Sequence, residues 1–123
     1  MNARKADALR TAEVVETIQE ARKRITAFKL TEESFLKSDT VEMRAVADAL
    51  LMCVLRVTEE AGKLSSRAKG LHPEIDWAGV AGMRNYLVHD YGNVDRRMVW
   101  VAIRDEFDAL ERACQQIVSE SDS

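Results

Sequence analysis

Apolar side chains recur every three or four positions along three long stretches of the chain, at about residues 14–28, 43–68 and 100–117. This spacing lines up one apolar stripe on a helix and is typical of helices that pack against other helices. The chain has 123 residues with five glycines and one proline, so it contains few residues that interrupt helices. The sequence therefore predicts an all-α fold, an antiparallel bundle of four to five helices.

Local signals predict where these helices begin and end. Asp39 is expected to cap the second long helix, and Gly70 is expected to close it in a left-handed backbone conformation. A shorter helix is expected to follow Asp76, which would cap it, and to end at Gly92.

The length of the chain corresponds to one domain covering residues 1–123, with its core at about residues 8–118. The formal net charge of −3 argues against a general nucleic-acid binder, because such domains usually carry a basic excess. RNA would therefore have to meet a local basic patch. Residues 22–24, 67–69 and 96–97 are candidates, although a solvated helix face is the simpler explanation of each.

The two cysteines, Cys53 and Cys114, both fall on apolar stripes. They are expected to be small buried side chains in a reducing compartment rather than disulfide partners. No apolar run follows the charged N-terminal residues, so no signal peptide is expected, and no stretch approaches the roughly 20 apolar residues that span a bilayer. The sequence predicts a cytoplasmic protein without a membrane segment.

Reactive side chains are concentrated in residues 82–92, which read Gly-Met-Arg-Asn-Tyr-Leu-Val-His-Asp-Tyr-Gly. Arg84, Asn85, His89 and Tyr91 offer a permanent cation, an amide, an imidazole and a phenol within about two helical turns. Arg84 and His89 are five residues apart, or about 140° around a helix axis, so their side chains can converge at the edge of a groove but cannot stack. Such a set suits chemistry on a phosphodiester.

The reaction that these groups favour is metal-independent cleavage of RNA. A neutral His89 imidazole would take the proton from a ribose 2′-hydroxyl, while Arg84 would bind the phosphate and stabilise the charge that builds on its oxygens. The reaction works best with an acid as well as a base, and the chain offers one suitable histidine, so a two-fold homodimer would supply the second. No ligands at metal-binding spacing lie near this segment, and neither a metal nor another cofactor is expected.

Two other functions are compatible with these residues. The same groove could bind a nucleotide or a partner protein without catalysis, with Arg84 recognising a phosphate, or the bundle could be a purely structural adaptor. A lone histidine on a helix more often packs beside a loop than acts in catalysis. Glu59 and Glu60 would ordinarily lie on an exposed helix face, but either one could orient Arg84 across the bundle.

Several longer motifs match one family of bacterial and archaeal proteins. They are His-Pro-Glu-Ile-Asp-Trp at 72–77, Gly-Met-Arg-Asn at 82–85, Leu-Val-His-Asp-Tyr at 87–91, Val-Asp at 94–95, Val-Trp at 99–100, Phe-Leu at 35–36 and Arg-x-x-Glu-x-x-Gly at 56–62. With these motifs the chain resembles, over about residues 14–117, the HepT-like branch of the HEPN superfamily, the toxin-side partners of minimal nucleotidyltransferase antitoxins. One departure is Lys63, which follows Gly62 where the family usually has glutamate.

The resemblance implies a fold, an activity and roles for four residues. Members of the family are small HEPN-like helical bundles that form homodimers, and their Arg/His motifs meet in an interfacial cleft that cleaves RNA. By position, Arg84 and His89 correspond to the catalytic pair and Asn85 to the polar residue beside the arginine. Tyr91 corresponds to the tyrosine that a nucleotidyltransferase antitoxin adenylylates to silence the toxin, in a type VII-like toxin–antitoxin system. An AMP group there would add bulk and negative charge two residues from His89.

Overall fold

The computed structural model describes residues 2–121, and within these residues it contains helices and no strand. The elements are α1 (Ala3–Ala27), α2 (Glu32–Lys37), α3 (Val41–Gly62), α4 (Ser66–Gly70), α5 (Trp77–Asp90), the 3₁₀ turn η1 (Tyr91–Asn93), α6 (Arg96–Asp105) and α7 (Phe107–Ser121). The predicted all-α fold is confirmed.

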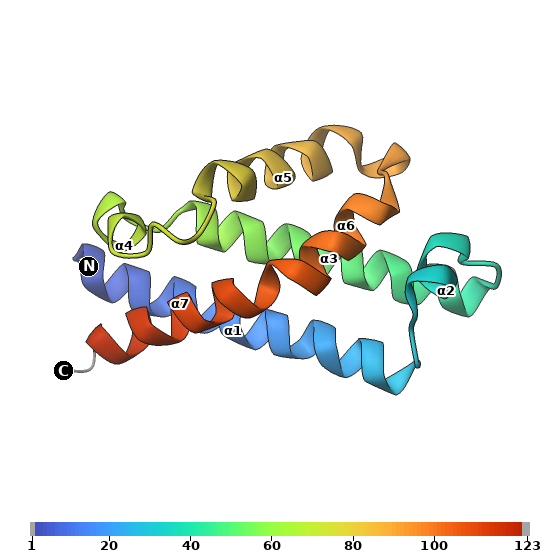
Figure 1. Ribbon diagram of the computed structural model, residues 1–123, viewed down its shortest axis with the longest axis horizontal. Helices are drawn as coiled ribbons and strands as arrows, with labels where there is room; N and C mark the ends of the chain where they lie inside the picture. Colours follow the sequence, from blue (N-terminus) through green and yellow to red (C-terminus); the bar gives the residue numbers. More distant parts are fainter. Residues whose placement is uncertain (1, 122–123) are drawn as a thin grey trace.

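Four antiparallel segments make up the bundle (Figure 1). α1 and α5 run in one direction, while α3 and the successive helices α6 and α7 run in the other. α3 lies in the middle, with α1 packed on one side and α5 on the other, and α7 lies along α1. The short helices α2 and α4 lie at opposite ends of the bundle. This arrangement leaves α5 as an outer helix that packs mainly on α3.

The core is built from the apolar stripes that the spacing predicted. Val14 and Ile18 of α1, Leu50 and Val57 of α3, and Cys114 of α7 have no exposed surface. Burial of such side chains is the main force that holds helices of this kind together, because isolated helices are marginally stable in water.

The prediction of buried, unpaired cysteines is also confirmed. Cys53 and Cys114 are both free and buried. Burial raises the pKa of the Cys114 thiol to about 12. It also raises the pKa of the Cys53 thiol, although Arg24 donates a hydrogen bond to that sulfur and opposes the shift. Neither thiol has the lowered pKa that a reactive cysteine requires.

Both predicted boundaries of the second long helix are wrong. Thr40 rather than Asp39 caps α3, because the Thr40 hydroxyl accepts a hydrogen bond from the backbone N–H of Met43 at 3.0 Å. α3 then ends at Gly62, and Gly70 ends the separate helix α4. Gly70 does not close a helix in a left-handed conformation, since no glycine in the described part of the chain has a positive φ.

A tertiary contact explains the break between α3 and α4. The buried Asp7 carboxylate of α1 accepts hydrogen bonds from the backbone N–H of Ser65, at 2.9 Å, and from its hydroxyl, at 2.5 Å. The same hydroxyl caps α4 by accepting from the N–H of Ala68 at 3.1 Å. These contacts hold Ser65 in an extended conformation, so the buried Leu64 lies in the connection and the buried Ala68 lies in α4.

The last predicted helix is two helices. α6 ends at Asp105 and α7 begins at Phe107, with Glu106 between them at a φ of −114°. α6 packs across α2 and α3 whereas α7 packs along α1, so the chain must change direction at this point. We call residues 105–107 the α6–α7 elbow.

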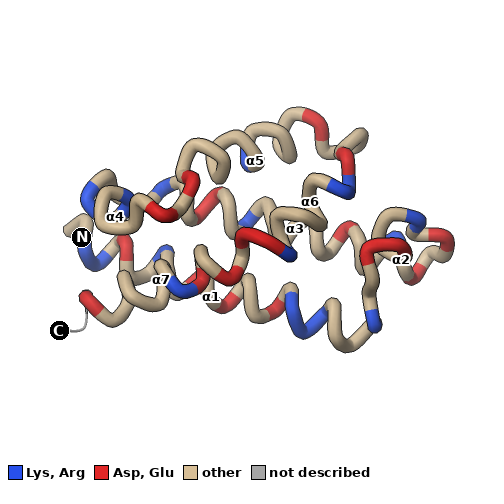
Figure 2. Tube along the Cα trace, in the orientation of Figure 1, with Lys and Arg blue, Asp and Glu red and all other residues tan. Residues whose placement is uncertain are grey.

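Two of the candidate basic patches, residues 22–24 and 96–97, are partly neutralised within the chain, and basic and acidic residues are interspersed over much of the bundle (Figure 2). Arg22 forms ion pairs with Asp108 and Glu111 of α7, and Arg97 pairs with Glu32 of α2. These contacts favour the structural explanation of the patches. In the described residues no helix has both the length and the apolar character needed to cross a membrane.

Candidate active site on helix α5

Helix α5, which carries the predicted site residues, is attached to its surroundings at both ends. Asp76 caps it as predicted, accepting a hydrogen bond from the N–H of Gly79 at 2.9 Å. The indole N–H of Trp77 donates to two carbonyl groups in the segment before the helix, at 3.0 and 3.1 Å. Beyond its C-terminal end, the N–H of Asp95 donates to the hydroxyl of Tyr86 at 2.7 Å. These contacts fix the orientation of α5 relative to the segments before and after it.

Arg84 is held by an acidic residue of α3. Its Nε donates to Glu59 Oε2 at 2.9 Å, and its Nη1 donates to Asn85 Oδ1 at 3.2 Å. Its Nη2 makes no hydrogen bond within the described chain, and 38% of the side chain is exposed. The hydrogen bond from Arg84 is the main reason that the pKa of Glu59 lies below its ordinary value. The possibility that Glu59 orients Arg84 across the bundle is thus confirmed, and one edge of the guanidinium stays open to a ligand.

Lys63 contributes a second cation to this cluster. Its Nζ lies 3.4 Å from Glu59 Oε1, so a single carboxylate lies between the charges of Lys63 and Arg84. The three side chains together carry one net positive charge. A glutamate at position 63, as the family usually has, would reverse that sign. The departure from the family motif therefore makes the surroundings of Arg84 more favourable to an anion.

His89 is exposed on the side of α5 that points away from the core. Leu87, on the opposite side of the helix, is the one fully enclosed residue of α5. Arg84 and His89 are not hydrogen-bonded to each other, because their five-residue separation turns them about 140° apart around the helix. Within one chain both side chains are accessible, and no hydrogen bond joins them.

The two tyrosines of this segment have different environments. The hydroxyl of Tyr86 accepts the hydrogen bond from Asp95 described above. Tyr91 follows the last residue of α5, begins the η1 turn and has 39% of its surface exposed, with no hydrogen bond to its hydroxyl from the described residues. The prediction had placed the end of this helix at Gly92, but α5 ends two residues earlier, at Asp90. Of the two phenols, that of Tyr91 is the accessible one.

Comparison of the sequence with known proteins identifies the family of this chain. The family model described as "Ribonuclease HepT-like" matches residues 16–117. The chain belongs to the HepT-like ribonuclease family. This match confirms the resemblance to HepT-like proteins that the motifs at 72–77 and 82–91 indicated.

Relatives in other organisms carry related names. A Thermococcus cleftensis protein named "Probable ribonuclease HepT" is 37% identical over 62 residues, which are 47% of this chain and 56% of that protein. A protein of Caldanaerobacter subterraneus subsp. tengcongensis, described as a candidate RNase, is 31% identical over 86 residues, or 70% of this chain and 72% of that one. A Methanocaldococcus jannaschii protein, also described as a candidate RNase, is 25% identical over 80 residues, or 65% and 69% of the two chains. No solved structure matches this HepT-like chain.

Lys63 is the residue of this cluster that the sequence did not place beside Arg84, whereas Glu59 was one of two acids that could orient it. Glu59 had a sequence signal, since it lies in the Arg-x-x-Glu-x-x-Gly motif at 56–62, but its contact with Arg84 joins α3 to α5 and depends on how those helices pack.

Among residues 2–121 no group of three or more His, Cys, Asp or Glu side chains is arranged to hold a metal ion.

Proposed function

We propose that this protein is a metal-independent endoribonuclease, the toxin of a pair whose antitoxin is a nucleotidyltransferase. It acts as a homodimer in which Arg84 and His89 from the two copies face one RNA linkage and Asn85 steadies the arginine. The proposal rests on how Arg84 is held and exposed in a chain of the HepT-like family. The guanidinium is fixed by Glu59, keeps an open edge, and belongs to the same exposed helix as His89.

The surface of α5 supports a dimer built on this helix. Its exposed residues include Ala78, Ala81, Gly82, Asn85, Val88 and His89. Arg84 is the one Lys, Arg, Asp or Glu between Asp76 and Asp90, so α5 presents little charge to a second copy (Figure 2). Small, uncharged side chains allow a second helix to approach closely. A two-fold axis beside α5 would bring the His89 of one copy towards the Arg84 of the other.

The proposed reaction uses these groups in a defined order. Neutral His89 takes the proton of the ribose 2′-hydroxyl, and the 2′-oxygen attacks the adjacent phosphorus. Arg84 binds the non-bridging oxygens, whose negative charge increases in the transition state. The bond from phosphorus to the 5′-oxygen breaks, and the protonated His89 of the second copy gives that oxygen a proton. The products are a 2′,3′-cyclic phosphate and a 5′-hydroxyl.

An RNA-cleavage assay in the presence of a chelator tests this function. We expect the purified protein to cut RNA in EDTA and to leave ends that carry a cyclic phosphate. His89→Ala should abolish the cleavage while its circular dichroism spectrum remains helical, because His89 is exposed and its side chain makes no hydrogen bond or ion pair among the described residues. Activity that requires a divalent cation, or that survives in His89→Ala, would reject the mechanism. Nucleotide binding without any RNA turnover would instead support a silent binding module.

Lys63 is expected to contribute to RNA affinity. In the His89→Ala background, which can bind but not cut, Lys63→Gln should weaken single-stranded RNA binding and lower the slope of log affinity against log salt by about 0.7. The matched control is Lys37→Gln, since Lys37 also pairs with a glutamate four residues away but lies on α2. Equal salt slopes for the two variants would show that Lys63 does not meet the RNA.

Tyr91 is the proposed site of silencing. With a cognate nucleotidyltransferase and ATP, intact mass spectrometry should show added AMP units on the wild type and on Tyr86→Phe, but not on Tyr91→Phe. The physical reason is access, because the Tyr91 ring is exposed and the Tyr86 hydroxyl is occupied by Asp95. Modification of Tyr91→Phe at the wild-type level would contradict the assignment.

A further inference from the structure

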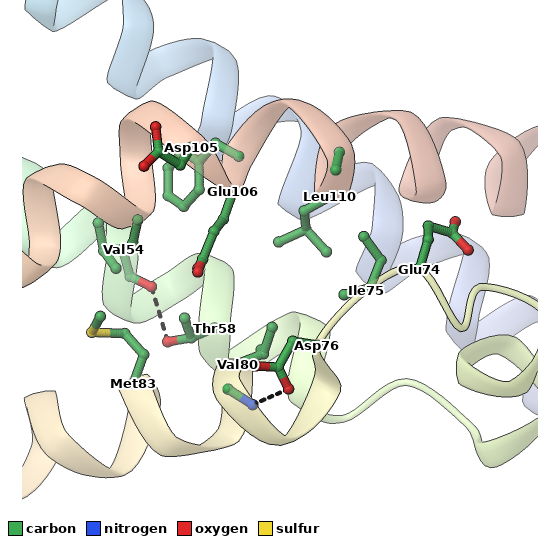
Figure 3. Close-up of a pocket in the computed structure, with 14 residues that line it drawn as sticks. Val54, Thr58, Glu74, Ile75, Asp76, Val80, Met83, Asp105, Glu106 and Leu110 are labelled. Atoms are coloured by element: carbon green, nitrogen blue, oxygen red, sulfur yellow. Dashed lines mark hydrogen bonds between the residues drawn. The ribbon is translucent and has the colours of Figure 1, made fainter.

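A cavity of about 200 Å³ lies between α5 and the α6–α7 elbow, on a floor formed by α3. It exists because α5 packs mainly on α3 while α7 packs along α1, which leaves the space between α5 and the elbow incompletely filled. Val54 of α3, Val80 and Met83 of α5, and Phe107 and Leu110 of α7 supply apolar walls (Figure 3). None of these groups belongs to the Arg84 cluster.

The residues that line this cavity include four carboxylates and no Lys, Arg or His. Three of the carboxylates have partners: Glu74 with His72, Asp76 with the N–H of Gly79, and Asp105 with Arg104. The side-chain carboxylate of the fourth, Glu106, has neither a hydrogen bond nor an ion pair among the described residues, although its backbone groups bond to Ala102 and Leu110. Figure 3 shows its side chain extending from the elbow into the space towards α5. Glu106 is thus an acid that lacks a cation at the edge of an apolar cavity.

The charges around Glu106 disfavour its ionised form. Glu106 is exposed as a residue, but partial desolvation of its carboxyl raises the pKa, and the negative charges of Asp76 and Asp105 raise it further. A cation placed beside Glu106 would relieve all three effects, since it would replace lost solvation and offset the neighbouring charges. The charge of the cavity is therefore complementary to a cationic group, and its walls are complementary to an aliphatic chain.

We propose that this cavity is a docking site for an arginine side chain presented by a partner protein, with the aliphatic stem against Val80 and Leu110 and the guanidinium on Glu106. The volume of about 200 Å³ is below the roughly 300–1,000 Å³ of pockets that bind drug-sized ligands, and it suits one long side chain. Arginine combines an apolar stem with a weakly hydrated, planar cation, which makes it the cationic residue best suited to partial burial at an interface. This site is independent of the proposed RNA cleavage.

Peptide binding measured by ¹⁵N-resolved NMR tests the proposal. The probe is acetyl-Ala-Arg-Ala-amide, and its matched control carries citrulline, which keeps the shape of arginine without the charge. We expect the arginine peptide to shift the amide signals of Gly79, Val80 and Phe107 in a saturable way. The citrulline peptide should bind about tenfold more weakly, because it loses a hydrogen bond between charged groups.

Two variants and one control link the binding to the cavity. Glu106→Gln keeps the shape of the side chain and should bring the arginine peptide down to the citrulline affinity. Ala109→Leu should fill the cavity and block both peptides, whereas Glu42→Gln, in the first turn of α3, should change nothing. Equal affinity for the two peptides, or no shifts at the cavity, would overturn the proposal. Binding of n-butylguanidinium without binding of the peptide would also overturn it, since the cavity would then take small molecules and not a partner's side chain.

Discussion

His89→Ala is expected to lower the rate of RNA cleavage by about 10²- to 10⁴-fold, the usual contribution of a general acid–base group. Arg84→Ala should lower it by at least about 10²-fold through loss of charge stabilisation on the phosphate. Each variant should be inactive as a homodimer. Their folds should survive, because His89 is exposed and Arg84 is only partly buried, in an ion pair with Glu59.

A mixture of these two variants distinguishes a site shared between chains from a site within one chain. After unfolding and refolding together, about half of the dimers should contain one copy of each variant. If the groove takes Arg84 from one copy and His89 from the other, such a mixed dimer keeps one complete pair. Activity should then rise at least tenfold above either parent, up to about one quarter of wild type. It should stay below that limit, because the proposed reaction also uses the His89 of the second copy as the acid and a mixed dimer carries only one His89.

The mixing experiment also has an outcome that contradicts the shared site. If Arg84 and His89 of the same chain act together, every mixed dimer lacks one member of each pair and the mixture stays inactive. Each variant refolded alone is the control for recovery of activity by refolding itself. This design follows from the positions of the two residues on one helix, since a five-residue separation corresponds to about 140° around the axis of α5.

Leu87→Ala is expected to have the largest effect on stability, lowering the free energy of unfolding by about 2–5 kcal/mol. Leu87 is fully enclosed and is the one buried residue of α5, so its loss would leave a cavity where α5 packs on the bundle. Chemical denaturation monitored by circular dichroism measures the change. The variant should also lose RNA cleavage in proportion to the loosening of α5, because the Arg84–Glu59 contact depends on the packing of α5 against α3.

The neighbouring residue Val88 supplies a matched control. Val88 is 45% exposed, so Val88→Ala should change the free energy of unfolding of the monomer by no more than about 0.5 kcal/mol. If Val88 lies in the proposed dimer contact, the same variant should instead weaken dimerisation, which sedimentation at several protein concentrations would detect. Equal losses of stability in Leu87→Ala and Val88→Ala would show that α5 is packed differently from the structure described above.

Much of the site could be predicted because its local determinants lie close together in the sequence. Asp76 caps α5 through a hydrogen bond that spans three residues, and the turn of the helix alone fixes the angle between Arg84 and His89. Tyr91 was assigned from the resemblance to HepT-like proteins, and in the structure it directly follows the same helix. By contrast, the choice between Tyr86 and Tyr91 as the free phenol required the contact from Asp95.

The sequence by itself determined that this protein is a helical bundle, because the three- and four-residue spacing of apolar side chains leaves one stripe per helix to bury. It also indicated which side chains are candidates for the reaction, since these fall within one short segment. Only the tertiary structure decided where α3 ends, where the last helix bends and which acid holds Arg84. Those outcomes depend on Asp7 meeting Ser65, on α7 following α1, and on Glu59 reaching across from α3. Each is a contact between residues far apart in the chain, and no local spacing specifies it.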